Sequence, residues 1–212
     1  MGLFDIEFIK KHVNFGEYKV CVETGTNLGY STTIMKNIFD EVYTIEIMEN
    51  LHKKALETFK DSNVKCILGD SGEKINELCS IIKKNCIFYL DAHWSGDNTT
   101  DYTKSLWKGY IDSDNKIETG YKGEKSSKPT SKQQVPLEEE MLTIYNTFPY
   151  KCVIYIDDID NFDNNGNGMK DKRFHGEDWS HINLSFLLKV MSNRIIYQYN
   201  TNYQLIICLK EI

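Results

Sequence analysis

Acidic residues stand at the ends of apolar runs in this chain, and such positions can carry chemistry. Asp91 closes the run that begins at Cys86, and the pair Asp157 and Asp158 closes the run that begins at Cys152. If these runs are neighbouring strands, three carboxylates meet at one sheet edge, where like charges repel unless a cation or a shared proton intervenes. Oxygen ligands suit Mg²⁺, Mn²⁺ or Ca²⁺ better than zinc. The sequence therefore predicts a divalent metal site at Asp91, Asp157 and Asp158; the alternative is that Asp158 faces solvent and only Asp91 touches a ligand.

A histidine follows Asp91 closely, at position 93. The unperturbed pKa of an imidazole suits proton transfer near neutral pH, so His93 is a candidate general base, and Asp91 is the other candidate. A structural or substrate-binding role for His93 stays open. Further along the chain, His175, Trp179 and His181 lie in or just after a polar stretch from which they could reach the same site.

A glycine-containing turn follows the first apolar run, in the sequence Val22-Glu-Thr-Gly-Thr-Asn-Leu-Gly-Tyr-Ser-Thr32. Gly25 and Gly29 allow the backbone to approach a ligand closely, and the helix that follows offers free N–H groups. The spacing alone is weak, because a tight strand-to-helix turn needs glycine whatever it binds. Ligand binding by this turn is the prediction, and a role in the turn alone is the alternative.

Two more acids end the second and third apolar runs. Glu46 comes about twenty residues after the glycine turn, where a carboxylate can accept both hydroxyls of a ribose. Asp70 follows the third run and can accept a hydrogen bond from an adenine amino group. Neither residue needs a ligand, because Glu46 can be a solvated acid and Asp70 can cap the helix that follows.

The elements that must position these residues follow from hydrophobic periodicity. Near-continuous apolar runs are typical of strands buried on both faces of a parallel sheet, and amphipathic helical stretches lie between them. This alternation predicts an α/β fold with a Rossmann-like, doubly wound, seven-stranded sheet. The last two runs form a hairpin, so the sheet is mostly parallel with an antiparallel last strand. The expected strands are 19–24, 41–46, 64–68, 86–91, 152–157, 194–199 and 203–209, and the expected helices are 29–39, 50–60, 72–84 and 136–147.

Two polar stretches interrupt the alternation. Residues 96–134 read as an insertion or flexible loop near the ligand-binding edge, and residues 160–178 read as a mobile loop rich in Asn and Gly. The run from Asp163 to Gly168 matches the first half of a calcium-binding loop, but Phe174 stands where a bidentate Glu is needed. We expect a single domain over residues 1–212.

Hydrophobic content and net charge indicate how many domains the chain forms and which classes of partner it can bind. A chain of 212 residues with 41% hydrophobic content suits one globular domain, and a net charge of −6 without a long basic run argues against nucleic acid. No leader and no membrane span are expected, so a cytoplasmic location is predicted. Most cysteines lie inside apolar runs and are expected to be buried thiols. The oligomeric state cannot be read from the sequence.

Together these features resemble the class I S-adenosylmethionine-dependent methyltransferases, over about residues 18 to 210. The glycine turn follows an acid, Glu23, and the terminal hairpin matches the reversed last strand of that class. Three segments look like the metal-dependent sugar and small-molecule O-methyltransferases, including macrocin-type enzymes and the domain of viral glycan-assembly proteins that methylates rhamnose. The segments are Phe88-Tyr-Leu-Asp-Ala-His-Trp-Ser-Gly96, Val135-Pro-Leu-Glu-Glu-Glu140 and Ile154-Tyr-Ile-Asp-Asp-Ile159.

The resemblance implies S-adenosylmethionine as methyl donor and a divalent metal at Asp91, Asp157 and Asp158. It implies a sugar or glycan hydroxyl as acceptor, with Asp91 or His93 as base, and the host cytoplasm as location if the protein is viral. A catechol-like small-molecule O-methyltransferase and a non-catalytic nucleotide- or glycan-binding module are the alternatives; the glycine pattern disfavours an NAD-dependent oxidoreductase. The implied donor-binding residues are Glu23, Gly25, Thr26, Gly29, Ser31, Glu46, Asp70 and Ser71.

Overall fold

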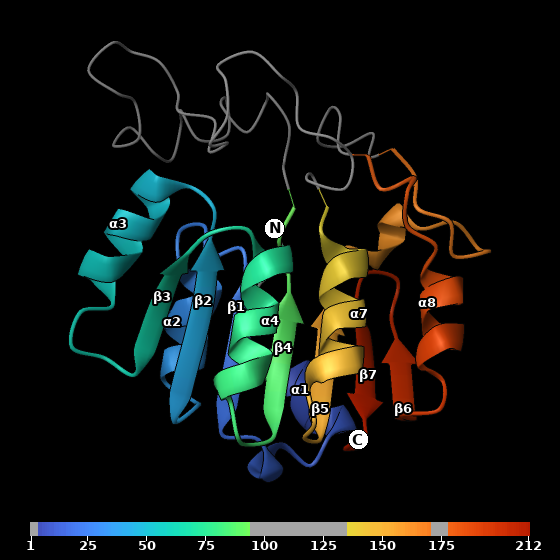
Figure 1. The fold of residues 1–212 in the computed structure, drawn as a ribbon, viewed down its shortest axis with the longest axis horizontal. Helices are drawn as coiled ribbons and strands as arrows, with labels where there is room; N and C mark the ends of the chain where they lie inside the picture. The colour runs from blue at the N-terminus through green and yellow to red at the C-terminus, as the bar shows by residue number, and fades with distance from the viewer. Residues whose placement is uncertain (1–3, 94–134, 171–177) are drawn as a thin grey trace.

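A seven-stranded sheet forms the centre of the molecule (Figure 1). The computed structural model describes residues 4–93, 135–170 and 178–212. The strands run in the order β3-β2-β1-β4-β5-β7-β6, so the α/β doubly wound prediction is confirmed. Their bounds are β1 Val20–Thr24, β2 Glu41–Glu46, β3 Val64–Leu68, β4 Cys86–Leu90, β5 Cys152–Ile156, β6 Ile195–Asn200 and β7 Leu205–Leu209.

The direction of the last strands also agrees with the sequence. Strands β1 to β5 pair in parallel, whereas β7 pairs antiparallel with both β5 and β6. The β6–β7 hairpin carries a register shift between Ile195 and Tyr197. The predicted terminal hairpin is therefore confirmed, and β6 forms one edge of the sheet.

Helices cover both faces of the sheet. Helices α4, α7 and α8 pack on one face through residues such as Leu78, Met141 and Leu187. Helices α1, α2 and α3 pack on the other face through residues such as Ile9, Met35 and Ala55. Figure 1 shows α4 and α7 in front of the strands, α8 beside β6, and α1 and α2 behind the strands. The helix bounds are α1 Ile6–His12, η1 Phe15–Glu17, α2 Tyr30–Lys36, α3 Glu49–Thr58, α4 Ser71–Ile81, α7 Leu137–Thr147, η2 Ile159–Asn161 and α8 Leu184–Met191.

The two-sided packing explains why the strands are apolar throughout. In β4, Phe88 and Leu90 face the layer of α4 and α7, whereas Ile87 and Tyr89 face the opposite layer. Successive side chains of a strand point to opposite faces, so a strand covered by helices on both sides needs apolar residues at nearly every position. All six cysteines are free thiols. Cys21, Cys86, Cys152 and Cys208 are buried as the sequence predicts, whereas Cys66 is only partly buried, and Cys79 on α4 is buried as well.

Of the two polar stretches, the structure describes only part of the second. The insertion at 96–134 lies outside the described residues. In the second stretch, the Asp163 carboxylate accepts hydrogen bonds from the backbone N–H groups of Asn165 and Asn167, both at 2.8 Å. These bonds close a turn, so Asp163 already has a role within the loop without a cation.

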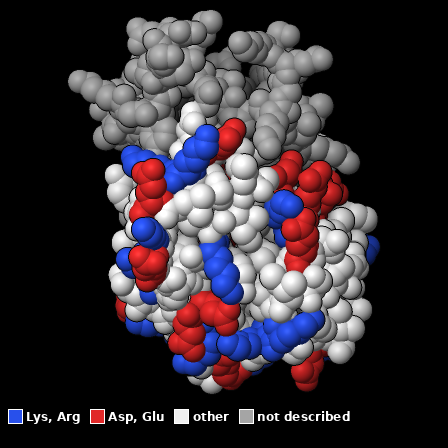
Figure 2. Space-filling model, turned by 60° about the vertical axis from the view of Figure 1, so that its left-hand side comes forward, with Lys and Arg blue, Asp and Glu red and all other residues white. Residues whose placement is uncertain are grey.

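On the face shown in Figure 2, Lys and Arg side chains are interspersed with Asp and Glu, so no single sign of charge covers that face. Within the described ranges, no helix combines the length and apolar character needed to cross a membrane.

Candidate functional site

The carboxyl ends of β1, β4 and β5 meet at one edge of the sheet. Thr24 pairs with Leu90, and Leu90 pairs with Ile156, so these strands end in register. Asp91 and Asp157 each follow the last residue of their strand and are brought side by side. In an open parallel sheet this edge is where ligands bind, so the placement agrees with the expectation from the sequence.

His93 lies between two of the predicted metal ligands. Its Nε2 atom is 3.5 Å from Asp91 Oδ1 and 3.2 Å from Asp158 Oδ2. One ligand atom from each of Asp91, His93 and Asp158 falls within 4.8 Å of the others, a grouping that can hold a metal ion. The structure thus brings two of the three predicted carboxylate ligands together and places the candidate base beside them.

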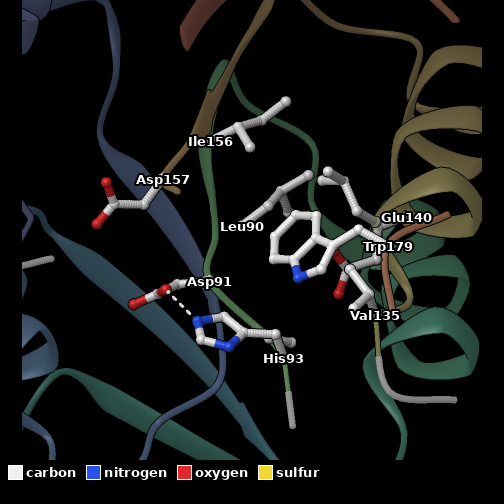
Figure 3. A pocket seen from close by; sticks show the side chains of 10 residues that line it. Leu90, Asp91, His93, Val135, Glu140, Ile156, Asp157 and Trp179 are labelled. Atoms are coloured by element: carbon white, nitrogen blue, oxygen red, sulfur yellow. Dashed lines mark ion pairs between the residues drawn. The ribbon is translucent and has the colours of Figure 1, made fainter. Parts of the chain in front are cut away.

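Asp157 occupies the other side of Asp91. The Tyr89 hydroxyl lies 3.1 Å from Asp91 Oδ2 and 3.5 Å from Asp157 Oδ2, so its one proton can be donated to either acid. Figure 3 shows Asp91 and Asp157 extending from neighbouring strand ends, with His93 beside Asp91. All four predicted metal or base residues therefore belong to one cluster.

Burial and mutual repulsion make it unfavourable for all the carboxyl groups of this cluster to be ionised together. Burial and then the charges of Asp91 and Asp158 raise the pKa of Asp157 to about 7. Burial also raises the pKa of Asp91, although the hydrogen bond and the charge of His93 oppose this rise. A group whose pKa is raised in this way holds a proton more readily, and a cation can replace that proton.

A small cavity of about 10 Å³ lies between β4, β5 and α7 (Figure 3). Its walls include Asp91, His93, Asp157, Glu140 and Trp179, together with aliphatic side chains. The rings of His93 and Trp179 are 5.9 Å apart between centroids. Trp179 thus reaches the site, as the sequence suggested; His181 bonds the Val135 carbonyl instead, and His175 lies outside the described residues.

Glu140 is the site residue that sequence reasoning missed. The signal was present, because Leu137, Met141 and Ile144 form the buried face of α7, and Glu140 shares that face. An acid on the apolar stripe of an amphipathic helix is costly unless it has partners or a function.

The glycine turn packs directly against the end of β4. Gly25 has φ +83°, and a Cβ there would lie 2.8 Å from the carbonyl oxygen of Asp91. Gly29 has φ +73°, and a Cβ there would lie 2.8 Å from the Phe59 ring. Packing alone therefore explains why both positions are glycine. Their predicted contact with a donor molecule stays a prediction.

Glu46 ends β2 beside this turn. Its buried carboxylate accepts hydrogen bonds from the backbone N–H groups of Asn27 and Met48, both at 2.8 Å and each on a different oxygen. Burial raises the pKa of Glu46, and these N–H groups oppose the rise. A carboxylate offers about four lone-pair sites, so Glu46 can still accept a hydrogen bond from a ligand hydroxyl.

Three of the predicted donor-binding side chains are used within the fold. The Glu23 carboxylate accepts hydrogen bonds from Thr32 at 2.5 Å and from Thr44 at 2.6 Å. The hydroxyls of Thr26 and Thr44 are 2.6 Å apart, and the Ser31 hydroxyl accepts a bond from the Phe4 backbone at 3.1 Å. These contacts join β1, β2 and α2 and give the side chains a role that needs no ligand.

The last two predicted donor residues begin α4. Asp70 is the N-cap of this helix and accepts a hydrogen bond from the Gly72 backbone N–H at 3.0 Å. Ser71 is buried, and its hydroxyl hydrogen-bonds the Glu140 carboxyl group. The capping alternative for Asp70 is therefore confirmed, which leaves its second oxygen for a ligand.

Solved structures share this architecture. A S-adenosylmethionine-dependent methyltransferase from Anabaena variabilis has 10% sequence identity and a TM-score of 0.53, covering 98% of this chain and 82% of its own. This chain shares the fold of that methyltransferase. An N-methyltransferase, NodS from Bradyrhizobium japonicum with S-adenosyl-L-homocysteine bound, has 7% identity, a TM-score of 0.49 and coverage of 97% and 84%. The PH0226 protein from Pyrococcus horikoshii has 12% identity, a TM-score of 0.49 and coverage of 97% and 87%.

Sequence comparisons add nothing to this likeness. No protein-family model matches the chain, and no curated protein matches it. The likeness therefore establishes the fold, and the activity has to be argued from the site.

Proposed function

We propose that this protein is an S-adenosylmethionine-dependent O-methyltransferase that acts on a sugar hydroxyl of a glycan with the help of a divalent cation. One observation carries the proposal: a single sheet edge holds both the glycine turn with Glu46 and the cluster of Asp91, His93 and Asp158. The first group suits a nucleoside ligand, and the second suits deprotonation of a hydroxyl.

The residues present fit the methyl donor. Glu46 lies at the end of β2 with both carboxylate oxygens held by backbone N–H groups, so it is oriented before a ribose arrives. The turn at Gly25 brings the β1 backbone against the end of β4 without a side chain in between. Asp70, fixed by its capping bond, stands at the next strand end.

The acidic cluster fits a divalent cation. Asp91, Asp157 and Asp158 would supply hard oxygen ligands. Burial and then repulsion by Asp91 and Asp158 raise the pKa of Asp157, and a cation would relieve that repulsion. The close grouping of Asp91, His93 and Asp158 favours a second arrangement, in which His93 is a ligand and Asp91 or Asp157 takes the proton.

When bound, the donor supplies a methyl carbon on a positively charged sulfur, and the cation lowers the pKa of the acceptor hydroxyl. His93 accepts the proton of that hydroxyl at a ring nitrogen, and Asp91 and Asp158 beside it stabilise the imidazolium. Transfer of the donor's methyl group to the acceptor oxygen would leave a methyl ether and S-adenosylhomocysteine, with the hydroxyl proton held at His93. The chain's part is to orient the two reactants and to hold the proton.

Calorimetric titration tests this proposal. We expect S-adenosylhomocysteine to bind the protein and NAD not to bind. Binding of neither ligand would reject the donor site, and preferential binding of NAD would favour an oxidoreductase. We expect the protein to transfer a labelled methyl group to a rhamnose-containing glycan but not to catechol. The reverse preference would reject the sugar acceptor but would still agree with S-adenosylmethionine-dependent O-methylation.

A further inference from the structure

Glu140 is a buried acid in the interior of α7 that the proposed reaction does not use. Its side chain is 1% exposed, on a helix face that otherwise carries Leu137, Met141 and Ile144. A leucine would pack there without the desolvation cost of a carboxyl group. The contacts of Glu140 therefore need an explanation.

These contacts lead to the end of β4. The hydroxyls of Thr24 and Ser71 both hydrogen-bond the Glu140 carboxyl group. Thr24 Oγ1 also accepts a hydrogen bond from the backbone N–H of Asp91 at 3.2 Å. A hydroxyl has one proton to donate, so Thr24 accepts from Asp91 and donates to Glu140. The result is a directed chain from the Asp91 backbone through Thr24 to Glu140.

The chain joins four elements at one point. Thr24 ends β1, Ser71 begins α4, Asp91 follows β4, and Glu140 belongs to α7. Helices α4 and α7 also pack against one another in the same apolar core. Glu140 thus links the half of the edge that carries the glycine turn to the half that carries the acidic cluster.

Glu140 also borders the cavity beside Asp91 and His93. Among the described residues, Glu140 Oε1 has no hydrogen-bond partner, and Glu140 is one wall of that cavity. A space of about 10 Å³ holds one water molecule, which can hydrogen-bond this oxygen. Burial raises the pKa of Glu140 to about 8, against the effect of Ser71 and Thr24, so the group is mostly neutral at pH 7.

We propose that Glu140 is a positioning residue, which holds Asp91 in place for metal binding and proton transfer by acting through Thr24. The inference rests on the proposed function for the role of Asp91, but the hydrogen-bond chain is independent of it. A neutral acid suits this task, because it accepts two hydroxyl bonds without adding charge beside Asp91 and Asp157.

The experiment compares variants that remove one member of the chain at a time. They are Glu140→Leu, which removes the acceptor; Thr24→Val, which removes the hydroxyl at constant shape; their double variant; and Glu140→Gln, which keeps an acceptor. Glu139→Leu is the matched control, because Glu139 is the exposed neighbour on the same helix. Mn²⁺ and S-adenosylhomocysteine affinities are measured separately by calorimetry, and crystal structures of the wild type, Glu140→Leu and Thr24→Val give the position of the Asp91 carboxylate.

We expect Mn²⁺ affinity to fall about 10- to 100-fold in Glu140→Leu and in Thr24→Val, as for other residues that orient metal ligands. The Mn²⁺ affinity of the double variant should be no lower than that of the single variant with the lower affinity, because both changes break the same hydrogen-bond chain. Glu140→Gln should stay within about threefold of the wild type, and Glu139→Leu should match it. The Asp91 carboxylate should move by about 0.5 Å or more in both crystal structures.

Three results would overturn the inference: an unmoved Asp91 in Thr24→Val, losses that add in the double variant, or a Glu140→Gln protein as weak as Glu140→Leu. Glu140→Met, which removes the acceptor but keeps the length of the side chain, replaces Glu140→Leu if that variant does not fold. Failure of the proposed function looks different, because then the wild type binds no S-adenosylhomocysteine. If the wild type binds the donor product but no Mn²⁺, the metal assignment fails, and the Asp91 positions alone decide the role of Glu140.

Discussion

Asp157 and Asp158 are neighbours in the sequence, yet their surroundings differ. Asp158 has φ +59°, a left-handed conformation that is uncommon for a residue with a side chain, and its carboxylate lies near His93. Asp157 instead lies near Tyr89 and is 5% exposed. The backbone turn at Asp158 therefore directs two adjacent acids to opposite sides of Asp91, which sequence spacing alone does not reveal.

Glu46→Gln tests the donor site. The amide nitrogen cannot accept a ribose hydroxyl, so S-adenosylhomocysteine should bind more weakly by about 1–3 kcal/mol in calorimetry. Because Glu46 also holds Asn27 and Met48, thermal unfolding must show that the variant is folded. The control is Glu49→Gln, which changes an exposed acid that pairs with Lys53. Equal donor affinity in the Glu46 variant and the wild type would remove this residue from the site.

His93→Ala separates the two arrangements proposed for the cluster. If His93 is the base, turnover should fall by about 10²- to 10⁴-fold while Mn²⁺ affinity stays close to that of the wild type. If His93 is a ligand, Mn²⁺ affinity should fall together with turnover. His12→Ala is the control, since that histidine bonds Tyr197 instead of the cluster. A variant with full turnover would leave Asp91 as the base.

At the scale of elements, the turn after β1 and the end of β4 are packed as one unit. Gly25→Ala would place a Cβ 2.8 Å from the Asp91 carbonyl oxygen at φ +83°. We expect a loss of about 1–3 kcal/mol in the free energy of unfolding, measured by denaturant titration. At Gly16 nothing lies within 4 Å of the added Cβ, so Gly16→Ala is the matched control and should be nearly neutral. Equal stability of the two variants would contradict this packing.

Glu23 joins β1 to α2 and β2 and makes stability depend on pH. Burial raises its pKa to about 8, although the Thr32 and Thr44 hydroxyls oppose the rise. The folded protein therefore binds this proton more tightly than the unfolded chain, so the contribution is full below the ordinary pKa of 4.5 and is lost as pH rises through about 8. Thermal unfolding between about pH 5 and pH 9 should show a shallower decline in Glu23→Gln than in the wild type. An unchanged slope would show that Glu23 titrates normally.

The parallel strands of the sheet could be predicted from the sequence. Buried parallel strands need apolar residues at nearly every position, so β1 to β5 appear directly in the sequence. The roles of polar side chains were harder to predict. Thr26 and Ser31 stand in the predicted donor turn, yet their hydroxyls bond Thr44 and Phe4, because the fold and not the spacing decides which way a hydroxyl points. Glu140 was missed for a similar reason, since its partners come from β1 and α4.

At the scale of the whole molecule, the ligand-binding edge has two halves with separate supports. Glu46 is held by the backbone N–H groups of Asn27 in the glycine turn and of Met48 after β2, and the Gly25 N–H donates to the Ile45 carbonyl of β2. Asp91, Asp157 and His93 are held by one another and by Tyr89. Thr24, Ser71 and Glu140 form polar contacts between the halves on the side of α4 and α7. Donor binding and proton transfer should therefore respond to different perturbations.

Removal of metal tests this separation. A chelator should abolish methyl transfer to a sugar hydroxyl, because Asp91, Asp157 and Asp158 would lose the cation that acidifies the acceptor. Affinity for S-adenosylhomocysteine should change little, since Glu46 and Gly25 lie on other strand ends. Mg²⁺ or Mn²⁺ should restore transfer, and Asp157→Ala should resemble the chelated protein, because one lost oxygen ligand weakens a site that Mg²⁺ enters reluctantly. Full activity in chelator, with no metal found in the protein, would leave a methyltransferase that relies on Asp91 and His93 as bases alone.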